Sequence, residues 1–164
     1  MKLTQLALLA ALAFAAKTGE QQPLGTGWPT YGGDPGGARY STASQIQRNN
    51  LDQLAPVWTF HTHALDNLRP GADLPSFEAT PVLSGDTLYL TSPYDVVFAL
   101  DARNGSERWR YDPALPPLKP GGITTSRGVA LWPLGATPSS NSAPCARRVF
   151  LATLDARLIA LDAD

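Results

Sequence analysis

The sequence has a single cysteine, Cys145, so no disulfide can form within this chain and the cysteine count does not report its redox environment. It also lacks an excess of charge of one sign, because 13 basic residues stand against 14 acidic ones without a basic stripe. This balance gives no support to a nucleic-acid or anionic-membrane partner. No GxSxG, Walker A or HExxH pattern occurs, so nothing predicts a serine hydrolase, a P-loop nucleotide site or a zinc protease.

Long apolar runs are absent except at the start of the chain. A basic start is followed by an apolar run over residues 3–16, which ends in the small-x-small pattern AFA. This order is typical of a secretory signal peptide over residues 1–16, although an uncleaved anchor is the alternative. No cysteine follows the run to serve as a lipoprotein acceptor. We therefore expect a mature chain over residues 17–164, in the periplasm or outside the cell.

Glycine (14) and proline (15) are frequent, as expected of short strands joined by many turns. A polar segment at residues 44–54 is predicted to contain one helical turn. Alternation of apolar and polar residues predicts strands elsewhere. The expected strands are residues 57–62, 77–83, 87–91, 96–100, 107–111, 128–132, 148–153 and 158–161.

A repeat organises these strands. In ALDARNGSERW, residues 99–109, one strand ends, Asn104-Gly105 supplies a tight turn, and Trp109 lies on the next strand. The sequence LIALDA repeats FALDA about sixty residues later. A recurring unit of this kind indicates a propeller or solenoid, and four antiparallel strands closing on a tryptophan form one propeller blade. The second copy reaches Asp164 before its glycine and tryptophan are due, so we expect a fragment of about two blades.

Several motifs together carry a family resemblance. They are WPTYGGD at 28–34, FEATP at 77–81, GDTLYL at 85–90, the 98–109 repeat, SRGVA at 126–130, and RVFLATLD with LIALDA at 148–163. Their spacing resembles that of pyrroloquinoline quinone (PQQ)-dependent dehydrogenases, the quinoproteins, and is most similar to the glucose/quinate/shikimate-type branch. Non-enzymatic propellers share the blade motif, whereas WPTYGGD combined with FEATP is more specific. The resemblance implies an all-β fold, namely the first blades of an eight-bladed β-propeller with the quinone and a Ca²⁺ ion near its axis.

The resemblance assigns cofactor-binding roles to two residues. Glu78 matches the family's glutamate that contacts the quinone, and Arg127 matches the arginine that holds it. A guanidinium fork suits the three carboxylates of PQQ. From the residues alone, Glu78 reads as an exposed strand carboxylate and Arg127 as a surface arginine. The family's catalytic aspartate and Ca²⁺ ligands are expected beyond Asp164, so the sequence names no catalytic or metal-binding residue.

The chain departs from the family at three positions near this arginine. Gly121 and Gly122 stand where the alcohol-dehydrogenase branch has adjacent cysteines, and Ile123 stands where the glucose branch has a histidine. Cys145 resembles a family position, and it either pairs with a cysteine outside this sequence or is a buried free thiol.

Two further patterns could have a binding role. His61 and His63 lie two apart on an expected strand, so they would share a face and could bind a metal, but no cysteine or carboxylate cluster adjoins them. The glycine-rich residues 32–37 are interrupted by Pro35 and are not framed as strand–loop–helix. They are therefore interpreted as a loop rather than a phosphate cradle.

The resemblance implies a periplasmic or secreted dehydrogenase that oxidises an alcohol or sugar hydroxyl and passes electrons to a respiratory quinone or cytochrome. Ca²⁺ would polarise the quinone carbonyl. By itself, two blades leave open edges, so we expect this chain alone neither to bind PQQ tightly nor to turn over. One alternative is a non-catalytic scaffold propeller, like the outer-membrane assembly lipoprotein. The lost cysteine pair and histidine favour it, whereas Glu78, Arg127 and the missing lipoprotein cysteine oppose it. A sugar-binding module has no sequence feature of its own.

Overall fold

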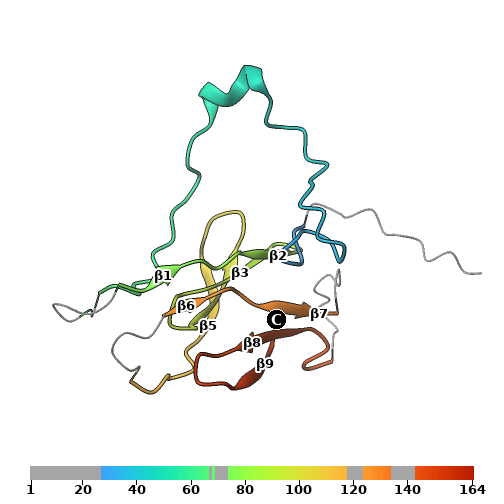
Figure 1. The fold of residues 1–164 in the computed structure, drawn as a ribbon. Helices are drawn as coiled ribbons and strands as arrows, with labels where there is room; N and C mark the ends of the chain where they lie inside the picture. The colour runs from blue at the N-terminus through green and yellow to red at the C-terminus, as the bar shows by residue number, and fades with distance from the viewer. Residues whose placement is uncertain (1–26, 67, 69–73, 118–123, 134–142) are drawn as a thin grey trace, which may run out of the picture.

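The computed structural model describes residues 27–66, 68, 74–117, 124–133 and 143–164 (Figure 1). Within these ranges the only helical element is η1 (Arg48–Gln53), a 3₁₀ helix in the predicted segment that lies away from the sheets (Figure 1). The strands are β1 (Ser76–Phe77), β2 (Val82–Ser84), β3 (Thr87–Thr91), β4 (Val97–Asp101), β5 (Glu107–Tyr111), β6 (Thr125–Ser126), β7 (Ala130–Trp132), β8 (Arg148–Ala152) and β9 (Leu158–Asp162). The predicted all-β class is confirmed. None of the described helical residues form a helix that could cross a bilayer.

The first sheet is antiparallel, in the order β2-β3-β4-β5, which is the expected blade. Gly85 and Gly105, with φ of 58° and 73°, form its two tight turns. The predicted strand at residues 77–83 is interrupted and becomes β1 and β2. Pro81 lies in the interruption, and because it has no N–H it cannot continue a hydrogen-bonded ladder.

The second sheet is antiparallel, in the order β7-β8-β9, and it packs against the first. The core between them buries residues of both sheets, namely Val82, Tyr89, Val97, Ala99, Leu131, Val149, Leu151 and Ala163. Inside this core the Tyr89 hydroxyl donates to the backbone oxygen of Ala163 at 2.8 Å. Burial raises the pKa of this phenol, so it stays a neutral donor.

A short parallel pair, β1 with β6, lies where the chain enters each of the two sheets. In this pair Ser76 lies opposite Thr125, and Phe77 lies opposite Ser126. Just beyond this pair, the backbones at Gly128 and Thr80 lie so close that a Cβ on Gly128 would be 2.9 Å from the Thr80 oxygen. β1 leads into the first strand of one sheet and β6 into the first strand of the other (Figure 1). Corresponding positions of two successive blades therefore lie side by side.

The predicted strand at residues 57–62 is wrong, since the structure has no strand there. The segment packs on the face of the first sheet away from the core, where the rings of Phe60 and Phe98 meet edge-on with centroids 5.1 Å apart. The reason is non-local: a strand needs the backbone of a neighbouring strand, and this segment has no ladder partner in the described ranges.

Trp58 makes the same kind of indole hydrogen bond to the first sheet that Trp109 makes to the second. The indole N–H of Trp58 donates to the Ala102 oxygen at 3.2 Å, and that of Trp109 donates to the Ala163 oxygen at 3.4 Å. Ala102 and Ala163 are the same position of the repeat. The segment carrying Trp58 thus occupies, relative to the first sheet, the place that β5 occupies relative to the second.

Polar contacts also tie the two sheets together. Asp95, which is 1% exposed, accepts a hydrogen bond from the Leu154 N–H at 2.7 Å. The buried Arg147 pairs with Asp164 and donates to the Ser84 hydroxyl at 3.3 Å. Because an unpaired buried charge or acceptor is costly, these contacts oppose any sliding of one sheet past the other.

Asp101, at the end of β4, gives an acid-stability prediction. Its carboxylate accepts a hydrogen bond from the Arg108 guanidinium, at 2.7 Å, and another from the Arg103 N–H, at 2.9 Å. These bonds hold its pKa below the usual 3.8, with the Arg108 bond contributing most. The stability that they provide is therefore complete above the unfolded-state pKa and is lost as the pH falls through the lower folded-state pKa.

We expect Asp101→Asn to lower stability near neutral pH and to flatten its decline below about pH 4. Urea unfolding midpoints at neutral and acidic pH measure both effects. The control is Asp52→Asn in η1, which changes the same type of side chain at an exposed position. An Asp101→Asn profile parallel to that of the unmodified protein would contradict the assignment.

Candidate cofactor-binding site

The structure brings together the two residues to which the sequence assigns cofactor binding. Arg127 Nη2 lies 3.1 Å from Glu78 Oε2. The register explains the contact, because each residue directly follows the last paired residue of its strand in the parallel β1–β6 pair. The sequence named the two residues separately, and their proximity comes from this pairing.

Ser76 is a third member of the cluster that the sequence reading missed. Its hydroxyl donates to Glu78 Oε1 at 2.9 Å, so each oxygen of the carboxylate has a different partner. A signal for this contact is present in the sequence. Residues two apart on an extended strand share a face, so a serine two positions before a glutamate can reach its carboxylate.

The cluster has the chemistry of an anion-binding site, in which the Glu78 carboxylate already occupies part of the Arg127 guanidinium. The Arg127 side chain is 80% exposed, so its guanidinium can accept a further carboxylate, while the Glu78 side chain is 40% exposed beside it. Two residues before Arg127, the Thr125 Oγ1 atom is buried and has no hydrogen-bond partner among the described residues. A guanidinium fork with hydroxyl groups nearby fits a cofactor that carries carboxylates.

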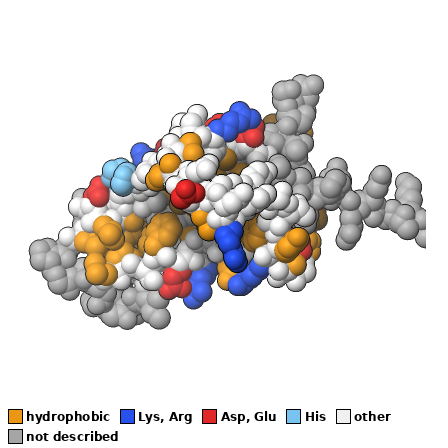
Figure 2. All heavy atoms as spheres, turned by 90° about the horizontal axis from the view of Figure 1, so that it is seen from above, with side chains coloured by type: hydrophobic (Ala, Val, Ile, Leu, Met, Phe, Trp, Pro, Cys, Tyr) orange, Lys and Arg blue, Asp and Glu red, His pale blue; other side chains and the backbone are white. Residues whose placement is uncertain are grey.

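Charged side chains of both signs occur on the surface shown in Figure 2. On the face seen in Figure 2, hydrophobic side chains gather in patches between separate acidic and basic ones. On this face the charges therefore do not form one broad basic patch.

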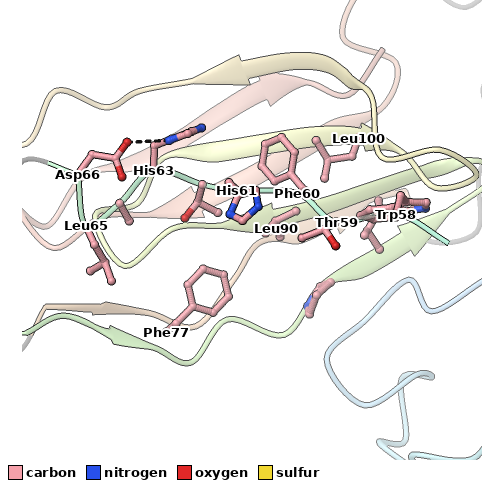
Figure 3. A pocket seen from close by; sticks show the side chains of 14 residues that line it. Trp58, Thr59, Phe60, His61, His63, Leu65, Asp66, Phe77, Leu90 and Leu100 are labelled. Carbon is pink, nitrogen blue, oxygen red and sulfur yellow. Dashed lines mark hydrogen bonds and ion pairs between the residues drawn. The ribbon is translucent and has the colours of Figure 1, made fainter. Parts of the chain in front are cut away.

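A groove of about 760 Å³ lies on the other side of β1. The segment from Trp58 to Asp66 forms one wall, and Leu88, Leu90 and Leu100 of the first sheet line it as well. Phe77 points into this groove (Figure 3). Since side chains alternate along an extended strand, Ser76 and Glu78 face away from it.

The two histidines in this groove wall do not assemble a metal site. Their ring centroids lie 6.3 Å apart, and His63 Nδ1 lies 2.7 Å from Asp66 Oδ2 (Figure 3). In the part of the chain that the structure describes, no group of three or more His, Cys, Asp or Glu side chains could hold a metal ion. The metal hypothesis for His61 and His63 gains no support from this arrangement.

Gly121, Gly122 and Ile123, the positions where the chain departs from the family pattern, lie outside the described residues. Cys145 is exposed, so the buried-thiol alternative is wrong, and pairing with a cysteine outside this sequence stays a prediction. Its backbone N–H donates to Asp162 Oδ2 at 2.9 Å.

The WPTYGGD motif packs beside β2, the first strand of the first sheet. Trp28 exchanges two backbone hydrogen bonds with Leu83, at 3.0 and 2.8 Å. The glycine-rich residues 32–37 form turns, which confirms the loop interpretation. This motif thus pairs with β2, the strand that directly follows the FEATP motif in the sequence.

The comparisons with known proteins agree with this architecture. A family model described as "Glucose/ethanol/alcohol dehydrogenase, beta-propeller domain" (PQQ) matches residues 28–164. The chain is 37% identical over 139 residues to the quinoprotein glucose dehydrogenase of Escherichia coli (strain K12), which covers 84% of this chain and 17% of that protein.

The solved structures similar to it include two from different alcohol dehydrogenases. The quinohemoprotein alcohol dehydrogenase from Comamonas testosteroni matches with a TM-score of 0.62 and 32% identity, over 84% of this chain and 18% of that one. A europium-containing methanol dehydrogenase matches with a TM-score of 0.59 and 28% identity, over 87% of this chain and 22% of that one. The chain therefore spans about a fifth or less of the length of these proteins. With its blade repeat, its parallel β1–β6 pair and a family match from Trp28 onward, the chain belongs to the PQQ-dependent glucose/ethanol/alcohol dehydrogenase β-propeller family.

Proposed function

We propose that this chain is the N-terminal part of a PQQ-dependent dehydrogenase that oxidises an alcohol or sugar hydroxyl, and that Glu78 and Arg127 help to hold the quinone. The observation that carries the proposal is the 3.1 Å contact between the two residues at the ends of β1 and β6. The names of the similar proteins, a glucose dehydrogenase and alcohol dehydrogenases, support the substrate class.

The two side chains have complementary roles in this proposal. Arg127 binds a cofactor carboxylate through its guanidinium fork, and Glu78 orients that fork through its Oε2 atom. Glu78 also offers an acceptor to donors on the cofactor. When bound, the quinone supplies the oxidising power by taking two electrons from the substrate carbon.

Further parts of the proposal rest on the sequence and on the family. Residues 1–16 act as a signal peptide, which places the protein in the periplasm or outside the cell. A Ca²⁺ ion, with ligands beyond Asp164, is the proposed metal. The similarity to a europium-containing methanol dehydrogenase supports a metal cofactor. A respiratory quinone or cytochrome is the proposed electron acceptor.

The test is PQQ binding by the apoprotein, expressed from its complete reading frame. We expect Arg127→Ala to weaken PQQ binding by about ten- to a hundredfold, because charge-assisted hydrogen bonds contribute about 1.5–3 kcal/mol. The PQQ affinity of Arg127→Lys should lie between those of the unmodified protein and Arg127→Ala, since an ammonium cannot bind a carboxylate in a bidentate manner. Titration of the apoprotein with PQQ, followed by fluorescence quenching, gives the dissociation constants.

Arg103→Ala is the matched control. Arg103 is also a highly exposed arginine paired with a carboxylate, that of Asp86, but it lies in the turn after β4 rather than directly after β6. If Arg127→Ala and Arg103→Ala bind PQQ equally well, the proposed role of Arg127 fails.

A further inference from the structure

We propose that Ser76 is a positioning residue for the cofactor site: its hydroxyl holds the Glu78 carboxylate in the orientation in which that carboxylate pairs with Arg127. The inference rests on the proposed function and extends it to a residue that the family pattern does not supply. It starts from a chain of two contacts, Ser76 Oγ to Glu78 Oε1 at 2.9 Å and Glu78 Oε2 to Arg127 Nη2 at 3.1 Å.

The backbone holds Ser76 in the parallel pair. Its N–H donates to the Thr124 oxygen at 3.0 Å, and the residue lies opposite Thr125 in the parallel pair. The Phe77 side chain points into the groove (Figure 3). Because side chains alternate along a strand, the Ser76 side chain lies on the opposite face, together with that of Glu78. A serine has one rotatable heavy-atom bond, so its hydroxyl adds little disorder to this position.

Glu78 and Arg127, by contrast, are long side chains that lose considerable freedom when they are held in place. The Arg127 side chain is 80% exposed, and among the described residues Glu78 is its ion-pair partner. Glu78 can orient the guanidinium only if its own carboxylate is fixed, and the Ser76 hydroxyl is the side-chain donor seen on its second oxygen. Without this bond the carboxylate could rotate, and the guanidinium would be less well placed for an incoming carboxylate.

The Ser76 hydroxyl also affects how strongly the Glu78 carboxylate competes with a ligand for the Arg127 guanidinium. An arginine that is fully satisfied by its neighbouring carboxylate has less to offer to a second anion. A hydroxyl that donates to that carboxylate takes up part of its hydrogen-bonding capacity and leaves more of the guanidinium for the ligand. Ser76 therefore acts on the cofactor through Glu78 and does not itself need to contact the cofactor.

The experiment measures PQQ binding by the apoprotein, expressed from its complete reading frame, with and without the Ser76 hydroxyl. We expect Ser76→Ala to weaken PQQ binding about three- to tenfold, and Ser76→Thr, which keeps a hydroxyl, to restore most of the affinity. In a Glu78→Ala background, Ser76→Ala should have no further effect, because the residue acts through the carboxylate. Ser106→Ala, at an exposed serine of the turn before β5, is the control for loss of a surface hydroxyl.

Each outcome bears on the inference. Unchanged binding by Ser76→Ala, or an equal loss in the Glu78→Ala background, overturns it. If Arg127→Ala loses affinity while Ser76→Ala does not, the proposed function stands and the inference alone fails. If Arg127→Ala also binds as the unmodified protein does, both fail. The urea unfolding midpoint of Ser76→Ala should match that of Ser106→Ala. If the midpoint of Ser76→Ala is lower, and if Ser76→Ala still weakens PQQ binding in the Glu78→Ala background, the role of Ser76 is purely structural and the inference fails.

Discussion

Gly105→Ala is expected to detach the segment at residues 57–62 from the first sheet. A Cβ at this position would lie 2.5 Å from Trp58 Cε3, which is an aromatic ring atom held in place by the indole hydrogen bond to Ala102. The backbone adds a second penalty, because Gly105 has a φ of 73°. The left-handed conformation and the overpacking together should cost about 2–5 kcal/mol of the free energy of unfolding.

Gly37→Ala separates these two effects. Gly37 has a similar φ of 68°, but a Cβ there would meet nothing within 4 Å. This variant should therefore cost only the backbone part, about 1–2 kcal/mol. Urea unfolding gives both values, and tryptophan fluorescence, assigned to Trp58 with a Trp58→Phe variant, reports the detachment. Equal losses in the two glycine variants would show that Trp58 does not pack on the turn.

Leu151→Ala is expected to destabilise the interface between the two sheets by about 2–5 kcal/mol. The side chain is fully buried, at 0% exposure, in the core that both sheets share. Its removal leaves a cavity that neighbours from two separate sheets cannot easily close, because the β1–β6 pair and the Asp95 hydrogen bond hold the sheets in place.

Leu51→Ala is the matched change at an exposed leucine. Leu51 is 53% exposed on η1, which lies away from both sheets (Figure 1). The expected loss is within about 0.5 kcal/mol. Chemical unfolding monitored by circular dichroism compares the two variants, and similar losses in both would contradict a core between the sheets.

Local signals in the sequence were sufficient for the elements built from adjacent strands. The bounds of β3 and β5 agree with the predicted residues 87–91 and 107–111, because alternation and the Gly85 and Gly105 turns act within a few residues. The segment at residues 57–62 has the same alternation and is not a strand. Its pairing depends on a backbone neighbour that the local pattern does not specify.

The site shows the same division between local and non-local information. Glu78 and Arg127 were identified by motif, 49 positions apart, but only the parallel register of β1 and β6 places them in contact. Ser76 was missed because its signal, a serine two positions before Glu78 on an extended strand, is not distinctive enough by itself to assign a role. Its role follows from the bond that its hydroxyl makes to Glu78.

The most direct test of the central claim is the ratio of the PQQ dissociation constants of Arg127→Ala and Arg103→Ala in the apoprotein. Both variants remove an exposed arginine from an ion pair, and they differ in whether that pair lies directly after the paired strands β1 and β6. If Glu78 and Arg127 form part of the quinone site, the ratio should be about ten or more. A ratio near one would show that the cofactor is held elsewhere.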